Sequence, residues 1–299
     1  MSDIKLFRRQ GDTIIELTGR SATVEKWLQT LIENHMETFL GVRFLATEYT
    51  TGKAHGGRID SLGIDENNYP VIIEYKRRTD ENVINQGLFY LDWLMDHQAE
   101  FQLSVQEKFG LDTSIAIDWS GPRLLCIASD FTKYDEHAVA QIDRNIELIR
   151  YRLFGKDLIL FELVNRSTSG SSKKFQACDG PETQAACELA SLNGSLKPVY
   201  EALREFILAL GEDVEERPLK LYVAFRRLKN FVCVVPGKTK NSLWLYIRMD
   251  PQSVALEDGF SRDVRDIGHW GTGDLEVQLR TLEDLEKAKP LIERSYHNS

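Results

Sequence analysis

The amino-acid sequence predicts a mixed α/β sheet flanked by helices over residues 1–165, followed by a small α+β domain over residues 182–299. Three observations support this division. Helix and strand signals alternate through the first half of the chain, as in a mixed sheet covered by helices. Residues 166–181 are rich in serine, glycine and lysine, which is typical of a linker. Strand signals then dominate the middle of the second half, and a helix signal closes it.

The elements of the first half follow from apolar patterns and turn residues. Residues 4–17 predict an edge strand or a hairpin, and a helix is expected to begin after Ser21 or Thr23 and to end at Gly41. Short apolar runs predict strands at residues 44–49, 58–64, 70–76, 123–128 and 158–164. The remaining helix signals lie at residues 82–94, with a broken continuation to 109, and at 135–153.

The second half has helix signals at about residues 182–210 and again at 281–295. Strands are expected near residues 219–227, 230–235 and 243–248, with a hairpin turn at 236–241. Helices at both ends of a run of antiparallel strands predict a small α+β domain.

Composition excludes several classes of protein. No apolar run approaches the roughly 20 residues that span a bilayer, and the N-terminus lacks the apolar core of a signal peptide. The four cysteines are scattered without a Cys-x-x-Cys pair. This pattern indicates reduced thiols rather than a disulfide framework or a zinc site. We therefore expect a cytoplasmic protein that has no membrane segment.

A formal net charge of −9 argues at first against a nucleic-acid partner. The distribution of charge changes this interpretation. Residues 1–165 carry 18 basic and 26 acidic side chains, whereas residues 166–299 carry 19 and 20. Residues 217–249 contain eight basic side chains and no acidic one. Some of the acidic excess of the first half would be required at a metal site.

Residues 56–77 carry the strongest chemical signal. They place Asp60, Glu74 and Lys76 on two apolar segments joined by a turn. Phosphodiester hydrolysis requires an activated water and stabilised negative charge, and Mg²⁺ supplies both when carboxylate oxygens hold it. Alternate side chains of a strand share one face, so Glu74 and Lys76 point the same way. A lone Glu-x-Lys is common and usually a solvated pair, but here it ends a rigid apolar strand close to a second acid.

These residues resemble the PD-(D/E)XK nuclease superfamily, and more narrowly its RecB-like branch. The resemblance covers residues 20–165 and rests on the motifs Gly57-Arg-Ile-Asp60, Glu74-Tyr-Lys76 and Gln86-Gly-Leu-Phe-Tyr90. It implies a restriction-endonuclease-like fold and a nuclease that depends on Mg²⁺ or Mn²⁺. It implies metal ligation by Asp60 and Glu74, catalysis by Lys76, and a site lined by Gln86 and Tyr90. DNA, or alternatively RNA, would be the substrate, in DNA repair or defence.

The resemblance also implies a carboxylate from the first helix. Periodicity predicts a buried stripe containing Val24 and Leu28, with Glu25 at its edge and with Glu33 and Glu37 on the opposite, solvated face. Glu25 is therefore the predicted third metal ligand. A carboxylate that only complements the helix dipole is an equal alternative for this residue.

Basic residues suggest where a nucleic acid would bind. Arg58, Arg77 and Arg78 surround the motif and could contact phosphates on either side of a cut, or form a solvated rim. In the second half, Arg226, Arg227 and Lys229 alternate with aromatic residues, as in a nucleic-acid-binding face. A half-buried antiparallel sheet with charges outside explains the same alternation.

The C-terminal motif Ile267-Gly-His-Trp-Gly-Thr-Gly-Asp-Leu-Glu-Val-Gln278 resembles a small uncharacterised domain appended to restriction-related proteins and to proteins called predicted transport proteins. The absence of a membrane segment argues against transport. Two main function classes therefore remain, a metal-dependent deoxyribonuclease and a non-catalytic nucleic-acid-binding or interaction protein with a nuclease-like fold. A structural scaffold that acts through the second domain is a third alternative. Loss of Asp60, Glu74 or Lys76 would favour the second class, and all three are present. A homodimer or accessory proteins are possible partners.

Overall fold

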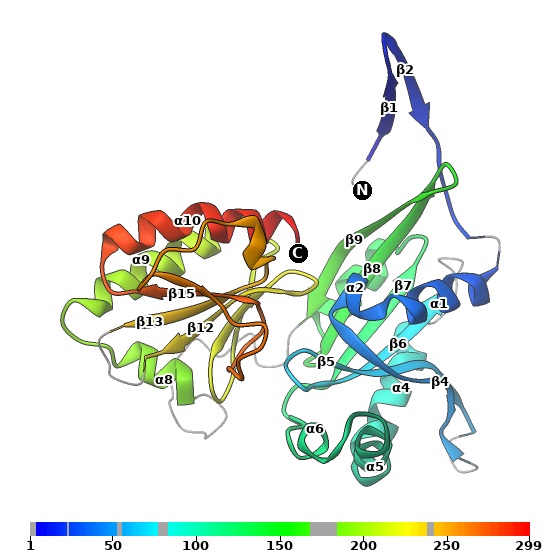
Figure 1. Cartoon of the computed structure of the whole chain (residues 1–299). Coiled ribbons are helices and arrows are strands. Elements are labelled where there is room, and N and C mark those ends of the chain that lie inside the picture. Colours follow the sequence, from blue (N-terminus) through cyan, green and yellow to red (C-terminus); the bar gives the residue numbers. More distant parts are fainter. Residues whose placement is uncertain (1–3, 23, 53–55, 77–82, 168–183, 238–241) are drawn as a thin grey trace. The chain divides into compact units, whose positions relative to one another are not determined.

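The computed structural model describes residues 4–22, 24–52, 56–76, 83–167, 184–237 and 242–299. The chain divides into two compact units, an N-terminal unit of residues 1–173 and a C-terminal unit of residues 174–299. Figure 1 shows both units. None of the described helices is long and apolar enough to cross a membrane.

The N-terminal unit is built on a mixed sheet with the strand order β3-β8-β7-β6-β5-β4, and β9 pairs with β8. The strands β6, β7 and β8 are parallel neighbours, whereas the other described pairs are antiparallel. Nearly every residue of these three strands is buried, as expected for strands covered on both faces. The strands are β3 (Gly19–Arg20), β4 (Val42–Thr50), β5 (Arg58–Asp65), β6 (Pro70–Lys76), β7 (Arg123–Ala128), β8 (Asn145–Phe154) and β9 (Leu158–Ser167).

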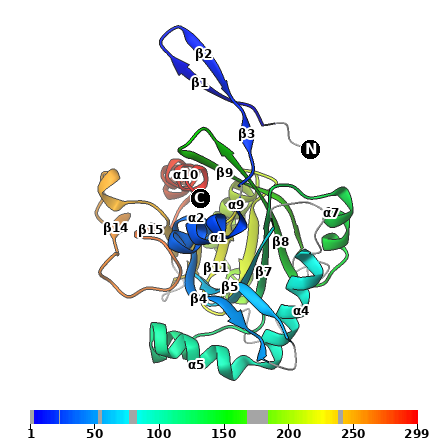
Figure 2. The ribbon, with the colours of Figure 1, turned by 90° about the vertical axis from the view of Figure 1, so that its right-hand side faces the viewer.

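Helices cover this sheet, so the predicted fold class is confirmed (Figures 1 and 2). One face is contacted by α1 (Glu25–Asn34), with α2 (Met36–Leu40) lying against β4. On the other face α4 (Val83–Asp96) packs so closely that a Cβ on Gly87 would lie 2.5 Å from the Leu124 side chain. The remaining helices of this unit are α5 (Gln98–Phe109), α6 (Leu111–Ile115) and α7 (Lys133–Ala140).

Two helix predictions in this unit need correction. The segment 135–153 is not one helix, because α7 ends at Ala140 and β8 follows. The β8 residues are buried between β7 and β9, where a short apolar run is satisfied as a central strand. The first predicted helix is divided at His35 into α1 and α2. Its predicted end is confirmed, since Gly41 caps α2 with a left-handed φ of 65°.

The chain begins with the hairpin predicted for residues 4–17. Its strands β1 (Leu6–Gln10) and β2 (Thr13–Leu17) pair with each other, and the hairpin projects away from the sheet in both views (Figures 1 and 2). Phe7 and Ile14 are more than half exposed on it.

The C-terminal unit contains an antiparallel sheet with the order β10-β11-β12-β13-β15-β14. Its apolar core joins this sheet to three helices, α8 (Gln184–Ala190), α9 (Leu196–Leu208) and α10 (Leu282–His297). The α+β prediction is correct, although the sequence signals missed β10, β14 and β15. The strands are β10 (Glu215–Pro218), β11 (Val223–Arg226), β12 (Asn230–Pro236), β13 (Leu243–Ile247), β14 (Ser261–Asp263) and β15 (Leu275–Leu279), with a 3-10 turn at Pro251–Ser253.

Candidate active site

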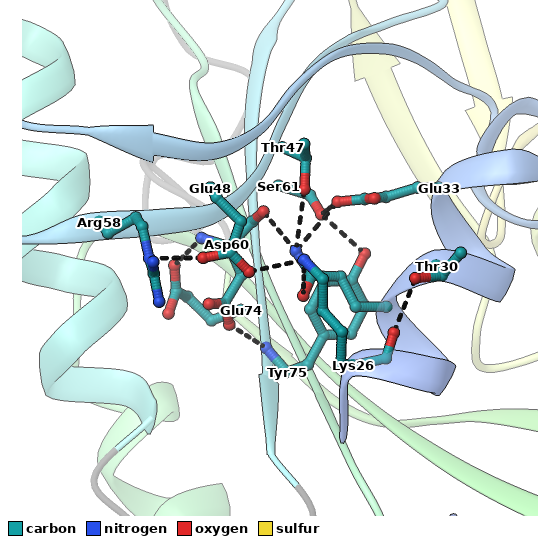
Figure 3. A network of polar contacts seen from close by, with 11 residues as sticks. Lys26, Thr30, Glu33, Thr47, Glu48, Arg58, Asp60, Ser61, Glu74 and Tyr75 are labelled. Atoms are coloured by element: carbon teal, nitrogen blue, oxygen red, sulfur yellow. Dashed lines mark hydrogen bonds and ion pairs between the residues drawn. The ribbon is translucent and has the colours of Figure 1, made fainter. Parts of the chain in front are cut away.

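The strands β5 and β6 separate at the acidic motif. Their backbone ladder extends from Ile64↔Pro70 to Ser61↔Ile73 and stops there. Beyond this point, carboxylates replace backbone carbonyls as acceptors. The Tyr75 N–H donates to Asp60 Oδ2 at 3.0 Å, and the Asp60 N–H donates to Glu74 Oε1 at 3.2 Å. The predicted pair of acids therefore lies side by side where the sheet opens (Figure 3).

Burial and mutual repulsion favour a proton on this pair. The Glu74 side chain is fully buried, and burial, followed by repulsion from Asp60, raises the pKa of Glu74 to about 9. Burial also raises the pKa of Asp60. The Lys76 ammonium opposes both shifts by favouring the charged carboxylates, so its charge acts on both acids. Strong pKa perturbation at a paired site is typical of functional residues.

The donor set of this site fits a hard divalent cation. Glu74 Oε2 is buried and has no hydrogen-bond partner among the described residues, and a buried carboxylate oxygen without a donor is costly unless a cation or a proton satisfies it. Mg²⁺ commonly takes one or two carboxylates and completes its shell with water and substrate phosphate. Within the described residues, no three His, Cys, Asp or Glu side chains are grouped to hold a metal. Asp60 and Glu74 are side chains that could hold such a cation.

Two residues of α4, Gln86 and Tyr90, hydrogen-bond to each other, and Tyr90 contacts the strand that carries Asp60. That they line the site stays a prediction. Tyr90 is buried, and its hydroxyl accepts hydrogen bonds from the Arg58 backbone N–H at 3.1 Å and from Gln86 Nε2 at 3.2 Å. Tyr90 thus joins α4 to the first residue of β5. Gln86 is half-buried beside it.

The backbone at Gly57 leaves no room for a side chain. A Cβ there would lie 2.5 Å from Tyr90 Cε1 and 3.2 Å from Thr51 Oγ1. We expect Gly57→Ala to displace Tyr90 and to destabilise the N-terminal unit by about 1–3 kcal/mol. The measurement is thermal unfolding followed by circular dichroism. Gly268→Ala is the matched control, because a Cβ there meets nothing within 4 Å. An equal melting temperature for Gly57→Ala and wild type would contradict the expectation.

The first helix presents a different carboxylate from the predicted one. Its buried stripe consists of Leu28, Gln29 and Ile32, whereas Val24 is 56% exposed. Glu33, assigned by periodicity to the solvated face, instead accepts a hydrogen bond from the Ser61 hydroxyl at 2.6 Å. The apolar pattern misplaces the stripe because the buried glutamine counts as polar in it.

Glu25 is half-buried at the start of α1. It does not join Asp60 and Glu74 in a group of three metal-binding side chains among the described residues. Glu33 contacts Ser61, which points to the opposite face of β5 from Asp60. The third metal ligand predicted from this helix is therefore not assembled.

Sequence patterns gave no indication of Gln29 as a site residue. Its amide Nε2 donates to the backbone carbonyl of Asp60 at 2.7 Å and lies 3.3 Å from Thr47 Oγ1. Gln29 is 3% exposed, so these bonds are shielded from water. The helix α1 thereby fixes the backbone of a candidate metal ligand.

The basic residues predicted to contact a nucleic acid lie in different environments. Arg58 is exposed next to the acids and pairs with Glu48, a residue that the sequence patterns did not single out. Arg77 and Arg78 lie outside the described residues. In the C-terminal unit, Arg226 is only 2% exposed and donates to the Leu228 carbonyl. Arg226 is therefore unavailable to a nucleic acid, and its predicted role is corrected.

The neighbours of Arg226 support the half-buried sheet interpretation. Arg227 donates to Asp213 Oδ2 at 2.6 Å and lies over the Tyr296 ring. Burial lowers the pKa of Lys229. Nucleic-acid contacts by Arg227 and Lys229 stay predictions.

Comparison with known proteins finds a family-model match in the C-terminal region. Residues 188–299 match the family model of a domain of unknown function, DUF5655. An uncharacterized protein of Haemophilus influenzae is 27% identical over 308 aligned positions, which cover 98% of this chain and 99% of that protein.

Among solved structures, the chain is similar to a repair endonuclease from Pyrococcus abyssi, with 18% identity and a TM-score of 0.29 over 46% of this chain and 50% of that one. It is also similar to EndoMS in a complex with double-stranded DNA, with 15% identity and a TM-score of 0.26 over 49% of this chain and 65% of that one. The chain thus spans about half to two thirds of these proteins. Similarity at this level does not assign a function, which must be argued from the side chains.

Proposed function

We propose that the N-terminal unit is a nuclease that hydrolyses DNA phosphodiester bonds with the help of Mg²⁺ or Mn²⁺. The observation that carries the proposal is the Asp60–Glu74 pair at the opening between β5 and β6. One oxygen of this pair, Glu74 Oε2, is buried without a hydrogen-bond partner among the described residues. A cation bound at this pair would satisfy the atom, which would otherwise be buried at a cost in free energy.

The chemistry assigns a role to each side chain. Asp60 and Glu74 would hold the cation, which when bound polarises the phosphate and lowers the pKa of a coordinated water. Lys76, whose charge acts on both acids, would orient the attacking water or neutralise the phosphate. Gln86 and Tyr90 would keep α4 against the entrance of the site. The buried strands β6 and β7 give the site the rigidity that positioned chemistry requires.

Cleavage assays test the proposal. Labelled single- and double-stranded DNA and RNA are incubated with the full-length protein in Mg²⁺, Mn²⁺ or EDTA. We expect cleavage of DNA in either metal and none in EDTA. Lys76→Met should reduce the rate on the order of 10²–10³-fold, because a charge aimed at the transition state is lost. Lys133→Met removes an exposed lysine from the start of α7 and is the control.

Two results would reject the nuclease. One is the absence of metal-dependent cleavage on every substrate. The other is cleavage that proceeds equally well in the Lys76→Met variant, which would point to a contaminating enzyme. Binding of DNA without cleavage in any metal would favour the non-catalytic alternative.

A further inference from the structure

A second charged cluster lies immediately beside the acidic pair. The ammonium of Lys26, on α1, donates to Glu48 Oε1 at 2.7 Å and to Gln29 Oε1 at 3.1 Å. Arg58, on β5, pairs with the other Glu48 oxygen through its Nε. One carboxylate on β4 thus holds two cations from two different elements (Figure 3).

The strained backbone conformation at Glu48 indicates that this arrangement is functional. Glu48 has a φ of 50°, in the left-handed region that a non-glycine residue rarely adopts inside a strand. The neighbouring register pairs are Thr47↔Ser61 and Tyr49↔Ile59, so Glu48 lies across from Asp60. Strained residues of this kind cluster at functional sites, where the surrounding structure maintains them. Its charged state is also favoured, because the hydrogen bond from Lys26 and then the Lys26 and Arg58 charges lower the pKa of Glu48.

The two cations keep donors for a ligand. The Lys26 and Arg58 side chains are 55% and 64% exposed, whereas Glu48 is 27% exposed. A guanidinium carries five N–H donors, so a single carboxylate leaves more than half of them unused. Glu48 is the ion-pair partner of Arg58, and the Arg58 charge also acts on Asp60. The ammonium of Lys26 likewise has a third hydrogen beyond its two described acceptors.

We propose that Lys26 and Arg58 form a phosphate clamp for the nucleic-acid backbone next to the cut, and that Glu48 is the positioning residue that sets their spacing. This proposal rests on the nuclease function, which supplies the reason for a phosphodiester at Asp60. A phosphodiester offers two non-bridging oxygens, which suit one ammonium and one guanidinium held apart by a carboxylate. An exposed ion pair without a ligand would contribute little to stability and would not explain the strained backbone.

Binding without cleavage tests the clamp independently of the nuclease. Fluorescence anisotropy of a labelled DNA duplex, and of its single strand, is measured in EDTA over a range of salt. We expect Lys26→Met and Arg58→Met each to weaken binding about 3- to 10-fold and to reduce the salt slope by about 1. Arg144→Met is the matched control, since Arg144 is exposed just before β8, at the opposite end of the parallel strands from Lys76.

Two variants of Glu48 distinguish a role in positioning Lys26 and Arg58 from simple electrostatic repulsion between Glu48 and DNA. Both remove a negative charge, so electrostatics alone predicts tighter DNA binding by Glu48→Gln and Glu48→Gly. The clamp predicts weaker binding for both, because the two cations lose their anchor. Glu48→Gly also relaxes the left-handed backbone, so it should melt no lower than wild type while binding less well. That separation would not arise from a merely structural role.

The outcomes are distinct from those of the nuclease test. Tighter binding by Glu48→Gln and Glu48→Gly would overturn the positioning role. Binding by Lys26→Met and Arg58→Met equal to that of Arg144→Met would overturn the clamp, even if the protein cleaves DNA. Clamp-dependent binding by a protein that never cleaves would retain the clamp and reject the nuclease.

Discussion

Glu74→Gln is expected to lose metal-dependent cleavage on the order of 10³-fold and, in EDTA at pH 8, to be more stable than wild type. The two effects have one cause. Without a cation, the buried Glu74 carboxyl must take up a proton on folding at this pH or remain an uncompensated charge. Either costs free energy that glutamine, with the same shape and no charge, avoids. A residue retained against stability in this way is typical of a functional site.

The sign of the pH dependence follows from the raised pKa. Glu74 has a pKa of about 9 in the folded protein, against an ordinary value of 4.5, which is expected in the unfolded chain. Between these values the folded state binds the additional proton, so its stability is greatest below the lower value and falls as pH rises toward the upper one. The slope is roughly 1.4 kcal/mol per pH unit for one proton. Glu74→Gln removes this slope, with an expected gain of about 2–4 kcal/mol at about pH 8 and little change near pH 4.5.

Urea unfolding of both proteins at several pH values in EDTA measures the effect. Glu37→Gln, at an exposed position on α2, is the control and should follow wild type. Saturating Mg²⁺ should reverse the order of stability, since it binds the carboxylates of wild type and not the glutamine. The Mg²⁺ concentration for half-maximal cleavage should also fall as pH rises, because binding releases the Glu74 proton. Parallel pH curves for Glu74→Gln and wild type would contradict the argument.

The centre of the site could be predicted from the sequence because its constraints are local. Asp60 and Glu74 belong to strands joined by a short turn, so the hairpin register brings them together. Gln86 and Tyr90 are four residues apart on α4 and therefore share a face. The order of helices and strands also follows from local patterns, except where the apolar run of β8 resembles a helix and where the signals missed β10, β14 and β15.

The rest of the site depends on contacts between distant segments. Glu48 lies outside the motif. Its proposed positioning role depends on a left-handed backbone conformation that no sequence pattern predicts. Periodicity places Glu33 on the wrong face because the stripe of α1 includes the buried Gln29, whose amide bonds the Asp60 carbonyl. Arg226 lies in a run of basic and aromatic residues, so the sequence predicts an exposed side chain. In the folded unit β11 is an inner strand of the sheet, and the Arg226 side chain is buried. In each case tertiary packing overrides the local pattern.

The second large effect is expected at the opposite end of β7. Arg123 is 2% exposed and donates to Asp65 Oδ2 at 2.8 Å and, from Nη2, to Glu147 Oε1 at 2.8 Å. Both carboxylates are also buried. Burial lowers the pKa of Arg123, but attraction to Glu147 and Asp65 outweighs it and raises the pKa above its usual value. Arg123 therefore stays charged inside the sheet.

Arg123→Met should destabilise the N-terminal unit by about 3–5 kcal/mol, because the buried Asp65 and Glu147 carboxylates lose the cation that hydrogen-bonds to both, and Arg166 lies 3.9 Å from Glu147. The loss should shrink at acid pH, where the stranded acids are protonated, and grow as pH rises. Adding Glu147→Gln and Asp65→Asn should restore much of the stability. The Asp65→Asn side chain keeps an amide oxygen that can accept from the backbone N–H groups of Asn67 and Tyr69, which now donate to the Asp65 carboxylate. Urea unfolding monitored by tryptophan fluorescence measures the series, with Arg144→Met as an exposed control. A triple variant no more stable than Arg123→Met would show that packing of the arginine stem, rather than its charge, holds this end of the sheet.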